Sequence, residues 1–177
     1  MTRTRRLAGT AVFTALAAVS VWLIPPFTLP GIPVAFTLQS FFVVLAGFVL
    51  PPAAASAAML GYVALGAAGL PVFAGGTGGL SVLVGPSGAF LWLFPAVAGA
   101  IALAVRGTNR TVIRIAAGIG FAILGLYPLA SLWTAFVAGI PWLSVLFGMT
   151  PYAVLDVVKV VLAAMLAKRL RRIADQH

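Results

Sequence analysis

Asp156 and Lys159 are the residues of this 177-residue chain whose types and spacing most clearly suggest chemistry. On a helix, residues i and i+3 share one face, and Tyr152 and Ala163 extend the same stripe. Charged side chains in an apolar, membrane-like segment usually face a cavity or one another. The pair therefore indicates either a mutually neutralising link between two helices or a ligand site. In a ligand site, Asp156 would accept hydrogen bonds from N–H groups and Lys159 would face a carboxylate or carbonyl.

A second polar cluster consists of Thr37, Gln39 and Ser40, in an otherwise apolar stretch. The amide of Gln39 both donates and accepts hydrogen bonds, which suits recognition of an amide or a urea. The alternative is a hydrogen bond between helices, a common use of polar side chains in membrane bundles. The sequence does not decide between the two.

Residues for other kinds of chemistry are scarce. The chain has no cysteine, and its one histidine is the terminal His177. We therefore expect no catalytic residues, no metal and no cofactor, because metal hydrolysis and Ser-His catalysis lack obvious residues. A Ser–Lys dyad that uses Lys159 is conceivable but has no supporting motif.

The composition points to a membrane. Hydrophobic residues make up 63% of the chain and charged residues 7%, against about 45–50% and about 25% in soluble domains. No charged residue or histidine lies between Arg6 and Arg106, and a second such run separates Arg114 from Asp156. Runs of this length exclude a water-soluble fold and also disorder. The sequence predicts a polytopic membrane protein.

The net charge of +9 comes from cations that border apolar segments. This is the placement that the positive-inside rule describes, and it argues against a nucleic-acid partner. The three basic clusters are Arg3, Arg5 and Arg6; Arg106, Arg110 and Arg114; and Lys168, Arg169, Arg171 and Arg172.

Proline and glycine divide the chain into six apolar segments, which we predict to be membrane helices in one domain spanning 1–177. With six spans, all three basic clusters fall on the cytoplasmic side, together with both termini. The first segment resembles a signal peptide, but five spans follow it and we expect it to be retained. The predicted spans are 7–24, 36–50, 53–70, 88–105, 113–137 and 151–167.

The same topology places the connections at 25–35, 71–87 and 138–150 outside. They are rich in glycine and proline and carry no charge. Such connections are expected to pack over the membrane surface or over a pocket. The glycines at 75–79 resemble a phosphate loop but lack its Lys-Ser/Thr ending, so tight turns close to a ligand are the better interpretation.

Small residues follow one face of the first predicted span. Ala8, Ala11, Ala15 and Ala18 recur at helical spacing, which permits close approach by another helix. A neighbouring helix of the same chain is the default partner. A separate membrane protein is the more specific alternative.

Several strings resemble the BioY-type proteins, the biotin-specific substrate-binding (S) components of energy-coupling factor (ECF) transporters. Residues 32–42 (IPVAFTLQSFF) are similar to the start of that family's second span. Residues 69–76 (GLPVFAGG), 79–80 and 83–88 (LVGPSG) are similar to its outer loop. Residues 151–156 with Lys159 are similar to its closing D-x-x-K helix. The resemblance covers nearly the whole chain.

The resemblance implies an all-α integral membrane protein, a compact six-helix bundle that binds biotin near the outer surface. It implies partners as well: a transmembrane coupling protein and two cytoplasmic ATPase subunits, in a bacterial-type plasma membrane. Ala11 and Ala15 match the alanine-spaced stripe that the family uses for the coupling protein. The positions that match the family's binding motifs are Thr37, Gln39, Phe73, Gly75, Gly76, Gly85, Ser87, Gly88, Asp156 and Lys159.

Three positions depart from the family pattern. Leu155 stands where a glycine often precedes the acid, Ser87 where threonine is usual, and Phe90 where tyrosine is common. The first alters how closely the backbone can approach a ligand, and the others remove a methyl and a hydroxyl group.

Three other functions stay open at this point. One is an S component for a different vitamin, another is a small intramembrane Ser–Lys hydrolase, and the third is a structural subunit. A binder should retain unchanged ligand, whereas an enzyme should turn it over.

Overall fold

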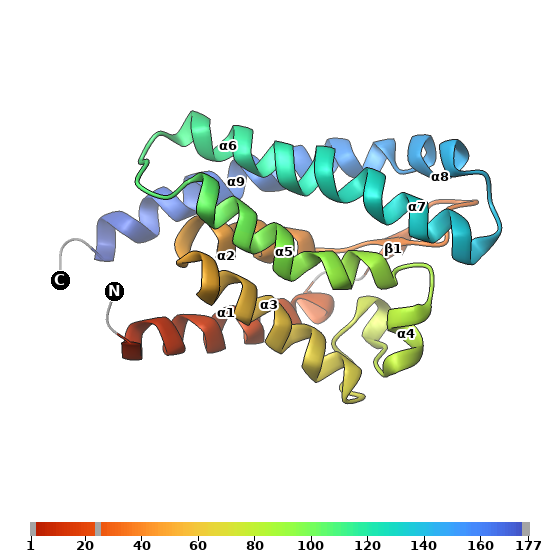
Figure 1. The fold of residues 1–177 in the computed structure, drawn as a ribbon, viewed down its shortest axis with the longest axis horizontal. Helices are drawn as coiled ribbons and strands as arrows, with labels where there is room; N and C mark the ends of the chain where they lie inside the picture. Colours follow the sequence, from red (N-terminus) through yellow and green to blue (C-terminus); the bar gives the residue numbers. More distant parts are fainter. Residues whose placement is uncertain (1–2, 24–25, 175–177) are drawn as a thin grey trace.

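The computed structural model describes residues 3–23 and 26–174, and most of them are helical (Figure 1). Two short strands and several short helices connect the longer helices. In chain order the elements are α1 (Arg3–Leu23), β1 (Phe27–Thr28), β2 (Ala35–Phe36), α2 (Gln39–Val49), α3 (Pro52–Ala67), η1 (Ala74–Gly76), α4 (Leu80–Val84), α5 (Gly88–Ala104), α6 (Thr111–Ile119), the π-helical η2 (Gly120–Gly125), α7 (Leu126–Ala138), α8 (Trp142–Gly148) and α9 (Thr150–Ala174).

Each predicted span overlaps one of these helices or a continuous run of them, and the helices extend past several of the predicted bounds. The helical runs Arg3–Leu23, Thr111–Ala138 and Thr150–Leu170 are long and apolar enough to cross a membrane. The second, third and fourth spans correspond to α2, α3 and α5, which are apolar but shorter. The fifth span is the unbroken run of α6, η2 and α7.

Proline and glycine set helix ends where the sequence predicts breaks. Pro51 lies just before α3 and Pro52 begins it, a position where the missing N–H is not needed and the fixed φ fits a helix. At the end of α7, Gly139 adopts a φ of 66°. This left-handed residue ends the helix, as glycine commonly does.

Small residues allow the central helices to pack closely. A Cβ added to Gly47 of α2 would lie 2.8 Å from Ile101 of α5, and one added to Gly99 would lie 2.3 Å from the Ser56 Oγ of α3. Side-chain hydroxyls also join the helices: Thr14 donates to the Ala58 carbonyl at 2.9 Å. The bundle is therefore held by close packing and by interhelical hydrogen bonds, as is typical of membrane helices.

The two ends of the bundle differ in charge. The start of α1, the connection from α5 to α6 and the end of α9 lie at one end, on the left of Figure 1. The three basic clusters lie in these segments, except that Arg114 lies in the first turns of α6. Arg114 differs from its cluster because its side chain is only 2% exposed and its Nη2 donates to the Thr108 carbonyl at 3.1 Å.

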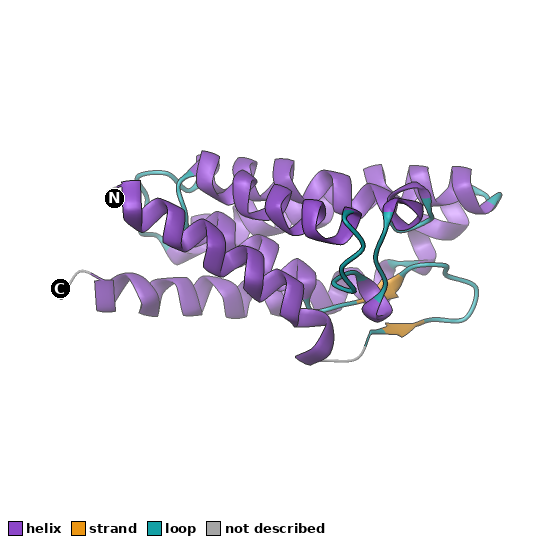
Figure 2. Ribbon diagram, turned by 90° about the horizontal axis from the view of Figure 1, so that it is seen from below, coloured by secondary structure: helices purple, strands orange, loops and turns teal. Residues whose placement is uncertain are grey.

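The other end carries folded connections that sequence analysis treated as loops. β1 and β2 pair as an antiparallel hairpin, with Phe27 opposite Phe36 (Figure 2). The 71–87 connection contains η1 and α4, and the 138–150 connection contains α8. These elements escaped prediction because strands of two residues and helices of three to seven residues are too short to show a hydrophobic period.

The alanine stripe of α1 faces away from the rest of the chain. Ala8, Ala11 and Ala15 are exposed, whereas Ala18 is buried. The default expectation that a helix of the same chain covers the stripe is therefore wrong for the first three alanines. The reason is the register of α1, which turns Phe13 and Ala17 toward the bundle instead.

One close contact supports the 71–87 connection and can be tested. The Phe73 ring is fully buried against Tyr62, with ring centroids 5.6 Å apart. A Cβ on Gly66 would lie 2.0 Å from the Phe73 ring. We expect Gly66→Ala to destabilise the purified protein by about 1–3 kcal/mol because the ring must move. Thermal unfolding in detergent measures this loss.

Gly120→Ala is the matched control, since a Cβ there meets no atom within 4 Å. The control should keep the stability of the unmodified protein. An equal loss in both variants would mean that loss of glycine, rather than collision with the Phe73 ring, causes the effect.

Candidate ligand-binding site

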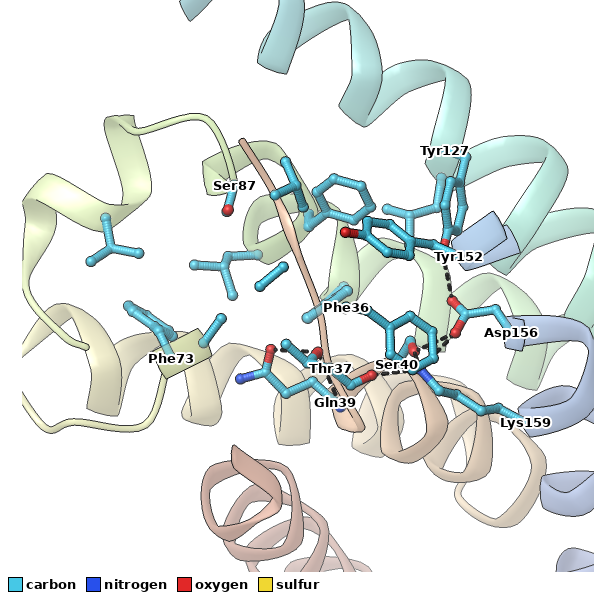
Figure 3. A pocket seen from close by; sticks show the side chains of 18 of the residues that line it. Phe36, Thr37, Gln39, Ser40, Phe73, Ser87, Tyr127, Tyr152, Asp156 and Lys159 are labelled. Atoms are coloured by element: carbon cyan, nitrogen blue, oxygen red, sulfur yellow. Dashed lines mark hydrogen bonds and ion pairs between the residues drawn. The ribbon is translucent and has the colours of Figure 1, made fainter. Parts of the chain in front are cut away.

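A cavity of about 140 Å³ lies at the end of the bundle that carries the hairpin (Figure 3). Residues from the hairpin, α2, α5, α7, α9 and the 71–87 connection surround it. The lining residues are Val34, Ala35, Phe36, Thr37, Gln39, Ser40, Phe73, Ala74, Thr77, Val82, Ser87, Phe90, Leu91, Phe94, Leu126, Tyr127, Tyr152, Asp156 and Lys159.

Asp156 and Lys159 form an ion pair in the wall of this cavity. The Lys159 Nζ lies 2.6 Å from Asp156 Oδ1, and the two residues are only 8% and 4% exposed. Ser40 donates to the same carboxylate oxygen at 3.1 Å, and the Tyr127 hydroxyl donates to Oδ2 at 3.0 Å. Three donors from α2, α7 and α9 therefore stabilise the buried carboxylate.

The Lys159 ammonium is equally well surrounded. Besides Asp156, it donates to the Thr37 carbonyl and to Ser40 Oγ at 2.9 Å, and it lies 3.5 Å from the centre of the Phe36 ring. An ammonium has three N–H donors and no acceptor. Ser40 donates its hydroxyl proton to Asp156 and accepts from Lys159, so its proton is not directed at Lys159.

Gln39 lines the cavity but uses both amide N–H groups within the protein. Its Nε2 donates to the Tyr62 hydroxyl at 2.6 Å and to the Val72 carbonyl at 3.1 Å. Thr37 donates to Gln39 Oε1 at 3.2 Å. The amide thus joins α2 to α3 and to the 71–87 connection, which is the interhelical alternative. Its oxygen keeps capacity for one more donor.

The hairpin is held over the cavity by an aromatic cluster. The rings of Phe27, Phe36 and Tyr152 have centroids 5.0 to 6.0 Å apart. The Leu29 N–H donates to the Tyr152 hydroxyl at 2.7 Å. One side chain of α9 therefore fixes the hairpin beside the residues that carry charge.

The 71–87 connection forms the part of the cavity opposite the ion pair, where Figure 3 places Phe73 and Ser87. It is attached to α7 by two hydrogen bonds. The Trp133 Nε1 donates to the Gly85 carbonyl at 2.9 Å, and Thr134 donates to the Pro86 carbonyl at 2.8 Å. These bonds hold Ser87 at its place on the cavity wall.

The structure brings together six of the ten predicted site residues. Those that line the cavity are Thr37, Gln39, Phe73, Ser87, Asp156 and Lys159. The four glycines are not among the lining residues; they shape the connection. Gly75 and Gly76 have φ of 75° and 69°, and a Cβ on Gly88 would lie 2.0 Å from the Leu83 carbonyl oxygen. Gly85 supplies the carbonyl that Trp133 binds.

Four residues at the site are not predicted as ligand-binding residues from the sequence: Phe36, Ser40, Tyr127 and Tyr152. Of these residues, Tyr127 is the one whose role the sequence indicates most clearly, because a hydroxyl in an apolar span needs a hydrogen-bonding partner. No spacing rule connects it with Asp156, which lies 29 residues away in the chain.

The geometry suits a small ligand with adjacent donor and acceptor groups. A carboxylate and an ammonium lie side by side at one end, aromatic rings line the wall, and hydroxyls of Thr77 and Ser87 lie toward the other end. Within residues 3–23 and 26–174, no three histidine, aspartate or glutamate side chains gather in a metal-binding arrangement.

Comparison with known proteins gives consistent matches. The biotin transporter BioY of Thermotoga maritima is 36% identical over 170 residues, which cover 96% of this chain and 97% of that protein. The biotin transporter BioY of Rhizobium etli is 36% identical over 173 residues, 93% of this chain and 92% of that protein. A crystal structure of the S-component for biotin from an ECF-type ABC transporter superposes with a TM-score of 0.92 at 24% identity, covering 97% and 95% of the two chains.

The structural match confirms the predicted fold class, a helical membrane bundle like that of ECF S components. The family match and the apolar helices also confirm a multi-pass membrane protein. The model of the BioY family matches residues 1–176, and with relatives similar over their whole length it establishes that this chain belongs to the BioY family.

Proposed function

We propose that this chain is a biotin-binding S component that captures biotin at its hairpin-covered end and delivers it for uptake. The observation that carries the proposal is the BioY family match along 1–176, with similar relatives named as biotin transporters. BioY proteins and ECF S components are substrate-binding transport proteins and not enzymes. The contacts of Ser40 agree with this, because its hydroxyl donates to Asp156 and accepts from Lys159, the reverse of the hydrogen bond that a Ser–Lys hydrolase needs.

The chemistry of the cavity complements biotin. Biotin has a ureido group with two N–H donors and one carbonyl, an apolar thiophane ring and a carboxylate tail. Because Asp156 and Lys159 contact each other, they meet the same end of an extended ligand. A ureido group presents an N–H beside its C=O, so the carboxylate would accept from the first and the ammonium would donate to the second.

The tail then runs toward the 71–87 connection. Phe73 and Ser87 border this part of the cavity, while Thr37 and Gln39 lie between it and the ion pair (Figure 3). The glycines Gly75, Gly76, Gly85 and Gly88 serve binding by giving the connection its shape. Phe90 and the aromatic cluster of the hairpin supply apolar surface for the ring system.

Equilibrium binding of labelled biotin to the detergent-purified protein tests this proposal. We expect saturable, near one-to-one binding that unlabelled thiamine and riboflavin do not displace, with biotin recovered unchanged. Asp156→Asn should weaken binding about 10- to 100-fold, since a hydrogen bond to a charged group contributes about 1.5–3 kcal/mol. Displacement by another vitamin, or no binding by folded protein, would contradict biotin as the ligand.

Comparing the binding of biotin with that of biotin methyl ester shows which end of the ligand Lys159 contacts. In our assignment Lys159 meets the ureido carbonyl. Each of the variants Lys159→Met and Asp156→Asn should therefore weaken the binding of the acid and the binding of the ester by equal factors. If the tail carboxylate met Lys159 instead, Lys159→Met would abolish the preference for acid over ester and overturn the assignment. Thermal unfolding of both variants controls for loss of the fold.

For uptake, we propose that the chain works with a transmembrane coupling protein and two cytoplasmic ATPase subunits in the plasma membrane. The likeness to an ECF-type S component supports a transport module as partner. The exposed Ala11 and Ala15 offer a flat helix face to another membrane helix. The basic clusters belong to segments at one end of the bundle (Figure 1), which supports an orientation with that end, and both termini, in the cytoplasm.

A bulky residue on this face should separate binding from transport. We expect Ala15→Trp to leave biotin binding unchanged in detergent but to lower ATP-dependent biotin uptake at least about tenfold, because it prevents close helix approach. Ala116→Trp is the matched control, an exposed alanine on α6, which lies on the other side of the bundle from α1 (Figure 1). Equal uptake by the two variants would contradict the assigned face.

A further inference from the structure

A second hollow lies at the basic end of the bundle, far from the ion pair. This groove has a volume of about 600 Å³ and lies between α1, the α2–α3 junction and the end of α5. Its lining residues are Arg6, Val49, Leu50, Pro51, Pro52, Ala53, Ala102, Leu103, Val105, Arg106 and Gly107.

The groove combines two cations with an apolar wall. Arg6 comes from α1 and Arg106 from the connection after α5, so two separate elements bring guanidinium groups to one hollow. The chain carries eleven lysines and arginines against two acidic residues, and one of these acids, Asp156, pairs with Lys159 toward the other end. The electrostatic field at the groove therefore favours an anion.

The shape of the wall indicates which anion. Leu50 and Val105 form a buried floor, whereas Leu103 is 61% exposed and opens the groove to the side of the bundle. In a membrane this opening faces hydrocarbon, close to the depth at which basic residues meet lipid headgroups. Guanidinium groups bind phosphate oxygens in paired hydrogen bonds.

We propose that this groove binds one anionic phospholipid, with its phosphate between Arg6 and Arg106 and an acyl chain along the apolar wall. Basic pockets between membrane helices on the cytoplasmic side are known to hold such headgroups. The site is separate from the biotin cavity and does not depend on the proposed function.

Native mass spectrometry with added dioleoyl phosphatidylglycerol or dioleoyl phosphatidylcholine tests the proposal on the full chain. We expect one phosphatidylglycerol to bind about tenfold more tightly than phosphatidylcholine. Arg6→Gln with Arg106→Gln should abolish this preference and leave biotin binding unchanged. The control, Arg110→Gln with Lys168→Gln, removes two exposed charges from the same end but outside the groove and should retain the preference.

A second variant tests the groove without changing its charge. Ala53 is exposed and lines the groove, so Ala53→Phe should fill it and weaken phosphatidylglycerol binding to a similar degree. Excess inorganic phosphate should leave the lipid bound, because it offers no acyl chain.

Three results would overturn the proposal. Equal binding of the two lipids would exclude a phosphate-selective site, and an equal loss in both double variants would indicate a general positive field. An unchanged lipid preference in Arg6→Gln/Arg106→Gln would show that the lipid does not bind between these arginines. If that variant also recovers less of the coupling protein, the groove belongs to a protein partner.

Discussion

The ion pair between Asp156 and Lys159 is the interaction on which the functional half of this molecule depends. Removing two charges from water costs several kcal/mol per ion, and their attraction offsets this only when the remaining donors and acceptors also have partners. Ser40 of α2, the Thr37 carbonyl just before α2 and Tyr127 of α7 supply those partners. The pair thereby fixes the relative positions of α2, α7 and α9.

Binding must then exchange one set of hydrogen bonds for another. In the structure, the three donors of Lys159 and both carboxylate oxygens of Asp156 already have protein partners. A ligand gains affinity there only if it replaces these contacts with equally good ones, since an unsatisfied buried polar group costs about 1–3 kcal/mol. A urea beside a carboxylate and an ammonium meets this requirement, and a purely apolar molecule does not. The arrangement therefore favours selectivity as much as affinity.

Much of this arrangement follows from the sequence. The absence of charge between Arg6 and Arg106 predicts the membrane class, and the i, i+3 spacing of Asp156 and Lys159 predicts their shared face. The structure adds what depends on long-range contacts. Tyr127, at the start of α7, meets Asp156 because the run through α6 and η2 that precedes it packs beside α9, and the Tyr152 hydroxyl holds the hairpin in place through Leu29. The outward register of Ala11 follows from the family resemblance and not from residue type, since alanine is equally suited to the inside and the outside of a membrane bundle.

A structure of this protein with bound biotin tests most directly whether Asp156 and Lys159 bind the ureido group. We expect a ureido nitrogen within hydrogen-bonding distance of an Asp156 carboxylate oxygen, at about 2.7–3.2 Å. We also expect the ureido oxygen beside the Lys159 Nζ and the carboxylate tail toward Ser87. A tail carboxylate bound to Lys159, with the ureido ring at the 71–87 connection, would contradict this assignment.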